Sequence, residues 1–505
     1  MKKLFSLFIL LFVCHAAKAN DIRVSNGTLG EQNTAEGYRI IEFDLSWENS
    51  WRTDNLFPDD GHSAGNWDAA WVFIKYSADF GQWRHAKLHY SGHSTGAGTP
   101  ATLDIGVPNE REAFHISDNP GVGAFIYRSE EGSGTFSTTG NKLRWNYAID
   151  GVADDAYITI RIFAIEMVYV APGPFWLGSG AEENGTFLAG GETGSTPFLV
   201  TENWDGCIEN IPGCLWGSST TENSTIGSPG SLNPDFPTGI DGFYSMKYSV
   251  SQQQYVDFLN TLTPSQAAAR AYTDGTFRNG ISLSDGRYQT SNPFLSNNFM
   301  NWMDGAAFAD WAGLRPMTET EYEKAARGPA APVANEHAWG STSIFQATGL
   351  MNPGQASELP TPSTANSNYW QDGNPIRGPI RVGSFANGST TREQSGAGYW
   401  GIMELSGDVW ERTVSAGNDT GRSFTGNHGN GKLTPEGNGA VTAWPGMQAQ
   451  GITGTSGAGL RGGSWVNSLT ELRVSYRRAA SDEVSSRNIN FGFRGVRSLP
   501  LAAGN

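Results

Sequence analysis

Short runs that alternate apolar and polar residues dominate the first third of the chain. Residues 38–47 read YRIIEFDLSW and residues 70–76 read AWVFIKY. Similar runs at 124–127 and 157–163 follow, with Gly, Asn, Asp and Pro between them. A side-chain period of two is typical of strands with one buried face, and regular turn residues mark the connections. The pattern predicts an all-β, sandwich-like unit over residues 20–166.

Helical spacing replaces this alternation at residues 251–261, 304–312 and 318–327. In each segment apolar side chains recur every three or four residues, which places them on one face of a helix. We expect Asp304 to cap the second helix, and Thr318 to open the third with a capping box. The second unit therefore mixes helices with strands.

Loop-forming composition surrounds these helices. Residues 182–237 are rich in Gly, Ser, Thr and Asn and are interpreted as a long insertion rather than a domain. From Gly340 onward helical periodicity disappears, and Gly, Asn, Ser and Trp dominate. The sequence therefore predicts an α+β, loop-rich second unit over residues 167–500, pinned by buried aromatic side chains.

The first 19 residues have the layout of a secretory signal peptide. A basic start precedes an apolar run at 4–13, and a small-x-small cleavage site ends at Ala19. The alternative is a lipoprotein signal with a lipidated Cys14, although Val13 is large for the position before such a cysteine. Either interpretation predicts export to the periplasm, the cell surface or the medium.

Two cysteines, Cys207 and Cys214, remain after removal of the signal peptide. An exported protein meets oxidising conditions, so a local disulfide between them is expected. A reactive or metal-binding pair is the alternative, but no histidine flanks these residues.

The charge balance narrows the classes of partner. The chain has 34 basic and 50 acidic residues, a formal net charge of −16. Nucleic-acid binding requires a basic surface, and no Lys/Arg cluster supplies one. No later stretch is apolar enough to cross a membrane. The acidic balance suits a soluble protein exposed to calcium, and equally suits ordinary solubility.

Three closely spaced histidines, His85, His89 and His93, stand in the predicted β unit. On a strand, a spacing of four residues would place all three on one face, where they could bind a metal. The alternative is that they are unconnected strand and turn residues with ordinary hydrogen-bond partners.

Several blocks in the second unit, taken in order, resemble the formylglycine-generating enzyme, or sulfatase-modifying factor, family. The resemblance implies a C-type-lectin-like fold with little regular secondary structure, which agrees with the loop-rich pattern. Residue 249 is serine where the family usually has glutamate. The blocks are MVYVAPGPFWLG at 167–178, YSVSQQQYVDFL at 248–259, AAFADWAGLRPMTETEYEKAARG at 306–328, GYWGIMELSGDVWE at 398–411, LRGGSW at 460–465 and FGFR at 491–494.

Oxidase members of that family bind copper through two cysteine thiolates near the C-terminus. The resemblance places those positions at Asn467 and Leu472, and neither side chain can supply a thiolate. Formylglycine-generating activity and a copper cofactor are therefore not expected. An iron-dependent sulfoxide synthase branch of the same superfamily uses a His-x3-His pair, a spacing that His85 and His89 match.

Calcium is the cofactor that the resemblance implies, since family members hold it through Asn, Asp and Glu oxygens and main-chain carbonyls. The first expected site comprises Glu404, the carbonyls of Gly407 and Val409, and Glu411. The second comprises Asn366, the carbonyl of Ser367, and Asp372.

The favoured hypothesis is an exported, non-catalytic protein that binds a protein, peptide or glycan. Its ligand pocket would occupy the place of the oxidase centre. One alternative is a metal-dependent oxidoreductase, and another is a diversified ligand-binder of a diversity-generating retroelement, whose variable segment would be 466–490. The expected pocket residues are Ser464, Trp465, Asn467, Tyr476, Arg478 and Trp410.

Overall fold

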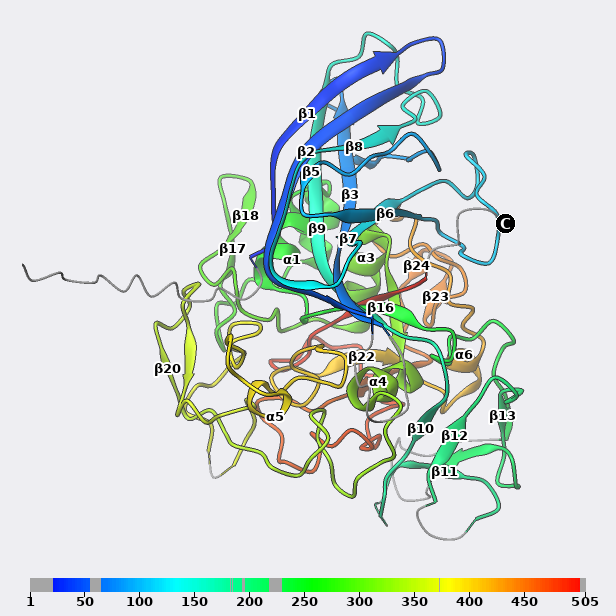
Figure 1. The fold of residues 1–505 in the computed structure, drawn as a ribbon, viewed down its shortest axis with the longest axis vertical. Coiled ribbons are helices and arrows are strands. Elements are labelled where there is room, and N and C mark those ends of the chain that lie inside the picture. Colours follow the sequence, from blue (N-terminus) through cyan, green and yellow to red (C-terminus); the bar gives the residue numbers. More distant parts are fainter. Residues whose placement is uncertain are drawn as a thin grey trace, which may run out of the picture.

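The computed structural model describes residues 21–54, 65–181, 183, 185–192, 196–217, 229–371 and 373–499. The expected signal peptide lies outside these residues. Within them, fourteen strands join in one large sheet, which starts in the N-terminal part and continues into the C-terminal part. Long curved strands form one end of the molecule, and helices with extended loops form the other (Figure 1).

Two layers of antiparallel strands build the N-terminal part. One layer has the order β1-β2-β8-β5, and in the other β3 lies between β9 and β7, with β6 beyond β7. Apolar residues from both layers form a shared core, so the sandwich-like pattern agrees with this arrangement. The strands are β1 (Arg23–Asn33), β2 (Tyr38–Thr53), β3 (Asn66–Ala78), β4 (Arg84–His85), β5 (Ala97–Gly98), β6 (Ala101–Gly106), β7 (Gly123–Arg128), β8 (Gly132–Trp145) and β9 (Ile158–Val170).

Strand β3 is buried on both faces. Val72 and Ile74 contribute to the core of the sandwich, whereas Trp71 and Phe73 contribute to the core of the C-terminal part. This double burial explains why residues 70–76 form a nearly continuous apolar run rather than a strict alternation.

Strand β9 links the two parts. It pairs with β3 from Ile158 to Val168, and its last residues, Met167–Val170, also pair with β16 (Phe243–Met246). The boundary expected at residue 166 therefore falls inside a strand that belongs to both parts.

The helices α1 (Gln252–Leu259), α3 (Trp302–Ala312) and α4 (Glu319–Arg327) correspond to the three predicted segments. Ser251 and Thr318 cap the first and the last with capping boxes. The expected cap Asp304 is wrong, because Asn301 caps α3 and Asp304 is the third helical residue that completes the box. Three short helices lacked a clear apolar period: α2 (Pro264–Arg270), α5 (Arg392–Ser395) and α6 (Asp419–Arg422).

The described residues of the insertion form a small four-stranded sheet of order β11-β14-β13-β15. A disulfide joins Cys207, in β13 of this sheet, to Cys214. The strands from this point to the end of the chain are short, as the loop-rich composition predicts. They are β10 (Phe175–Leu177), β11 (Phe187–Ala189), β12 (Phe198–Val200), β13 (Cys207–Ile208), β14 (Leu215–Gly217), β15 (Gly230–Ser231), β17 (Ile281–Ser284), β18 (Arg287–Thr290), β19 (Arg315–Thr318), β20 (Gly349–Met351), β21 (Leu359–Thr361), β22 (Glu411–Val414), β23 (Met447–Gln448), β24 (Gly451–Ile452), β25 (Ala458–Arg461) and β26 (Gly495–Ser498).

Helices of the described part of the chain are all too short or too polar to traverse a lipid bilayer.

Candidate functional site

The loop that follows β25 carries three of the residues expected in a pocket. Gly462 and Gly463 adopt positive φ angles of 92° and 67°, which turn the chain sharply after the strand. Ser464 is fully buried, and its hydroxyl donates to the side-chain oxygen of Asn467. Trp465 is also buried, and its backbone N–H donates to the Asp408 carbonyl at 3.0 Å.

The buried carboxylate of Asp408 fixes the base of this loop. It accepts hydrogen bonds from Ser296 Oγ at 2.6 Å, and from Asn368 Nδ2 and the Ile380 N–H at 2.9 Å each. Burial raises the pKa of Asp408 above its usual value. The connection before α3 and the connection between β21 and α5 thus converge on one side chain, which makes the surroundings of Trp465 rigid.

A cleft of about 760 Å³ opens beside Trp465. Phe277 lies 5.6 Å from Trp465 between ring centroids, and Trp370 remains 45% exposed on the rim. The Trp370 N–H donates to the Asn467 carbonyl at 2.8 Å, so the rim is tied to the loop. The cleft is lined by Phe277, Gln346, Thr348, Trp370, Gln371, Gly373, Asn374, Pro375, Arg377, Trp465, Val466 and Ile489.

Polar groups stand at fixed places around these rings. Asn374 donates to the Trp465 carbonyl at 3.0 Å, and its own oxygen accepts from the Arg377 N–H at 3.3 Å. The Arg377 guanidinium lies 5.9 Å from the Phe277 ring centroid. Gln346 donates to the Gly373 carbonyl at 2.9 Å. A cleft with aromatic walls and a few fixed polar groups has the properties of a ligand site.

The two positions that the resemblance assigns to copper-binding cysteines have different surroundings. Asn467 is partly exposed beside the cleft. Leu472 is fully buried, and its carbonyl accepts from Ser406 Oγ at 2.7 Å. Neither residue lines the cleft, and the expected pocket residue Ser464 does not line it either; the leucine fills the interior.

Trp410 and Tyr476 do not line this cleft. They pack with Leu460 and Phe491 in a separate cluster, 6.3 Å apart between ring centroids. Asn490 links the two places, since its amide donates to Ser464 Oγ at 2.8 Å and its carbonyl accepts from the Trp410 N–H. Arg478 is also absent from the cleft lining.

Glu411, expected at the first calcium site, is completely buried against Arg494. Its Oε1 accepts from Arg494 Nε at 3.0 Å and from Ser249 Oγ at 2.8 Å. Its Oε2 is buried and has no hydrogen-bond partner among the described residues.

Glu404 has a similar arrangement of oxygens. Its Oε1 accepts from the Gly383 N–H at 2.6 Å, while its buried Oε2 lacks a partner in the described part of the chain. Burial, and next the charge of Asp408, raise the pKa of Glu404 to about 8. The oxygens Glu404 Oε2 and Glu411 Oε2, both buried and without a hydrogen-bond partner among the described residues, are candidate ligands of a cation. The described residues include no group of three or more His, Cys, Asp or Glu side chains placed to hold a metal, so calcium would need main-chain carbonyls as well.

The oxygens expected at the second calcium site already accept hydrogen bonds. Asn366 Oδ1 accepts from the Phe345 N–H at 2.8 Å, and the Ser367 carbonyl accepts from the Ala347 N–H at 2.9 Å. Asp372 lies outside the described residues.

The three histidines do not converge. His85 is buried, with Nδ1 2.9 Å from Lys75 Nζ and Nε2 2.6 Å from the Val122 carbonyl. His93 Nε2 contacts the His89 carbonyl at 2.6 Å. In the described structure these rings are held by ordinary hydrogen bonds and form no metal cluster.

Sequence reasoning identified the loop at Trp465 but missed most of the cleft. Phe277 and Gln346 come from two loops, Trp370 and Arg377 come from a third, and the four share no periodic pattern. The only local signal was composition, since exposed aromatic residues in Gly- and Asn-rich loops are candidates for ligand contacts.

Comparison with known proteins gives a family and distant relatives. The description "Sulfatase-modifying factor enzyme 1-like domain" matches residues 164–499. The hercynine oxygenase of Mycolicibacterium smegmatis is 28% identical over 190 residues, which cover 35% of this chain and 32% of that protein. The hercynine oxygenase of Mycobacterium tuberculosis is 29% identical over 186 residues, 35% of this chain and 31% of the relative. The chain thus matches about a third of the length of these curated relatives.

One solved structure, Treponema denticola variable protein 1, aligns with 66% of this chain and 96% of its own length. Its sequence identity is 14% and its TM-score is 0.30.

Proposed function

Since the chain belongs to the sulfatase-modifying factor enzyme 1-like family, we propose that it is an exported binding protein of that family without formylglycine-generating activity. A family fold can carry unrelated functions, so the proposal depends on the chemistry of this chain's own site.

The cleft beside Trp465 is the observation that supports ligand binding most directly. Three aromatic rings and Arg377 surround a space of about 760 Å³, and Trp370 stays 45% exposed on its rim. Large exposed aromatic side chains on a rigid frame are typical of binding surfaces. The ligand would be a protein, peptide or glycan that places an apolar face on these rings and a polar group near Arg377.

The residues at the expected thiolate positions support the absence of oxidase chemistry. Neither the Asn467 amide nor the Leu472 side chain can act as a soft copper ligand. The disulfide-bonded Cys207 and Cys214 belong to the insertion and do not line the cleft.

Calcium remains part of the proposal at the first expected site. The unsatisfied oxygens of Glu404 and Glu411 would hold it, together with the carbonyls of Gly407 and Val409. The ion would neutralise buried carboxylates and brace the segment that leads from Glu404 to β22.

A metal-dependent oxygenase is the second candidate, and the names of the two relatives favour it. Iron chemistry would require histidine ligands. Among the described residues, His85 contacts the Val122 carbonyl and His93 contacts the His89 carbonyl, and no metal-binding group forms. Metal analysis of the purified protein distinguishes the candidates, because stoichiometric iron or copper would support the oxygenase.

The deciding experiment has two arms. The full chain is applied to glycan and peptide arrays alongside Trp370→Ala and the control Phe345→Ala, an exposed aromatic residue outside the cleft. We expect capture of a ligand by the wild type and the control, and its loss in Trp370→Ala.

In the second arm the protein is incubated with copper, oxygen and a sulfatase peptide. Aldehyde formation there would refute the proposal.

A further inference from the structure

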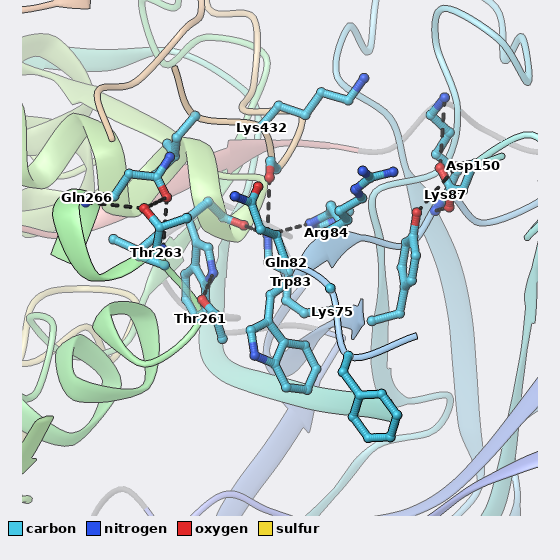
Figure 2. Close-up of a pocket in the computed structure, with 18 of the residues that line it drawn as sticks. Lys75, Gln82, Trp83, Arg84, Lys87, Asp150, Thr261, Thr263, Gln266 and Lys432 are labelled. Carbon is cyan, nitrogen blue, oxygen red and sulfur yellow. Dashed lines mark hydrogen bonds and ion pairs between the residues drawn. The ribbon is translucent and has the colours of Figure 1, made fainter. Parts of the chain in front are cut away.

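A second large pocket lies where the N-terminal sheet meets the C-terminal part, and it shares no lining residue with the cleft at Trp465. Its volume is about 930 Å³, at the upper end of the range for small-ligand sites. The connection between β3 and β4 forms one wall, and loops near Thr263 and Lys432 form the other (Figure 2).

Basic side chains gather at this pocket although the chain carries a net charge of −16. Arg84, Lys87 and Lys432 line it, with Asp150 as the only carboxylate of the lining. Lys87 and Asp150 are 3.9 Å apart, whereas Arg84 and Lys432 have no ion-pair partner among the described residues. Figure 2 shows Arg84 between Lys432 on one side and Lys87 with Asp150 on the other. A recess lined mainly by one sign of charge attracts ions of the opposite sign.

The turn before β4 has an unusual backbone. The Gly81 N–H donates to the Ala78 carbonyl at 2.9 Å, and the two residues between them, Asp79 and Phe80, have φ angles of 50° and 60°. Such turns favour Asn-Gly at these positions, because a side chain other than Asn or Gly is strained there. Phe80 nevertheless occupies the glycine position and is 85% exposed. Folding gains little from so exposed a ring, and the ring is free to contact a molecule outside the chain.

Aromatic side chains lie beside the basic residues of the pocket. Phe80 stacks on Tyr157 at 4.9 Å between centroids, and Tyr157 is 59% exposed. Trp83 lines the pocket, and the Arg161 guanidinium lies 4.4 Å from its ring centroid, which holds the indole in place. The pocket therefore offers fixed flat apolar surfaces beside exposed cations.

The floor of the pocket is rigid. Lys75 Nζ lies 2.7 Å from the Trp311 carbonyl, 2.9 Å from His85 Nδ1 and 3.3 Å from the Gly431 carbonyl. These three acceptors occupy the three donors of the amine. The contacts to Trp311 and Gly431 join β3 to α3 and to a loop of the C-terminal part, so the two walls hold a constant separation.

We propose that this junction pocket binds an acidic carbohydrate. The C–H faces of sugar rings would pack on Phe80 and Trp83, and carboxylates would pair with Arg84 and Lys432. The exposed amide of Gln82 also lines the pocket and can bond ring hydroxyls. Aromatic rings beside two exposed cations favour a ligand that has both sugar rings and carboxylates over a free anion such as phosphate.

The probes are galacturonate and mannuronate hexasaccharides, with a neutral maltohexaose and inorganic phosphate as comparison arms. Binding to the full chain is measured by calorimetry at low salt. We expect at least one uronate to bind and to weaken with added salt, and we expect Arg84→Ala with Lys432→Ala to weaken it by about tenfold or more. The control pair Arg23→Ala with Lys142→Ala removes the same charge away from the pocket and should leave affinity within about twofold.

Phe80→Gly provides a test that misfolding cannot explain. It removes the ring and relieves the turn, so it should weaken uronate binding without lowering the melting temperature. Failure of both uronates to bind, equal binding of maltohexaose, phosphate binding in their place, or equal loss in the control pair would each overturn the proposal.

Discussion

Arg494 donates to Glu411 through Nε at 3.0 Å, and both side chains are completely buried. The same guanidinium donates to the carbonyls of Met246, Lys247 and Met403. One arginine thus joins β16, β22 and the loop before β22 inside the protein.

Removal of that arginine should be severely destabilising. Arg494→Met would leave Glu411 as a buried charge without its partner, and we expect a loss of about 3–5 kcal/mol in the free energy of unfolding. Urea denaturation measures the loss. The control is Lys142→Ala, which breaks an exposed ion pair with Glu42 and should cost about 0–1 kcal/mol. Similar costs for the two variants would contradict a structural role for the buried pair.

The backbone strain at Phe80 can be measured independently of any ligand. Phe80→Gly and Phe80→Ala both remove the exposed ring, but only glycine relaxes the positive φ of 60°. The glycine variant should therefore be more stable than the alanine variant by about 1 kcal/mol. Thermal and urea denaturation of the two variants give this difference directly. An alanine variant that equals or exceeds the glycine variant would show that the turn is not strained.

His93 should give the protein an acid sensitivity. Burial lowers the pKa of His93 to about 4, whereas an unfolded histidine titrates near its ordinary value of 6.5. The folded-state pKa is depressed, so the stabilisation is complete above pH 6.5 and is lost as the pH falls toward 4. His93→Gln removes this contribution.

The difference in unfolding free energy between wild type and His93→Gln should therefore change by roughly 3 kcal/mol between pH 7 and pH 4. His115→Gln is the control, because His115 is exposed. A constant difference across this pH range would refute the assignment.

Calcium at Glu404 and Glu411 would make thermal stability depend on a chelator. A ligand bound only to the native state adds about 2.7 kcal/mol when its concentration is one hundred times its Kd. EDTA should lower the melting temperature, and excess calcium should restore it. Glu404→Gln should abolish the response, whereas Asn366→Ala, at the second expected site, should retain it. A melting temperature that EDTA leaves unchanged would exclude the ion.

Hydrophobic periodicity and capping residues predicted the strands and helices whose stability depends on neighbouring residues in the sequence. The alternation in residues 38–47 corresponds to β2, and Thr318 caps the helix that its position indicates. The cap of α3 was misassigned because Asn301 and Asp304 bond each other reciprocally, and either residue type can cap a helix.

The cleft and the junction pocket could not be predicted in the same way. Phe277, Trp370 and Trp465 meet only because buried polar side chains such as Asp408 and Asn374 bring their loops together. Phe80 gave no signal, since the conformation of a turn depends on the strands that flank it. Tertiary hydrogen bonds, rather than periodicity, determine these sites.

The two-sided burial of β3 has a consequence for how the molecule could be divided. Its pairing with β9 runs through eleven residue pairs, and its opposite faces serve different cores. A fragment starting at Met167 would expose the rings and aliphatic groups that Trp71 and Phe73 now cover, together with an unpaired strand edge. Such a fragment should aggregate rather than fold alone. The N-terminal strands therefore complete the core of the C-terminal part, and both parts should melt in one cooperative transition.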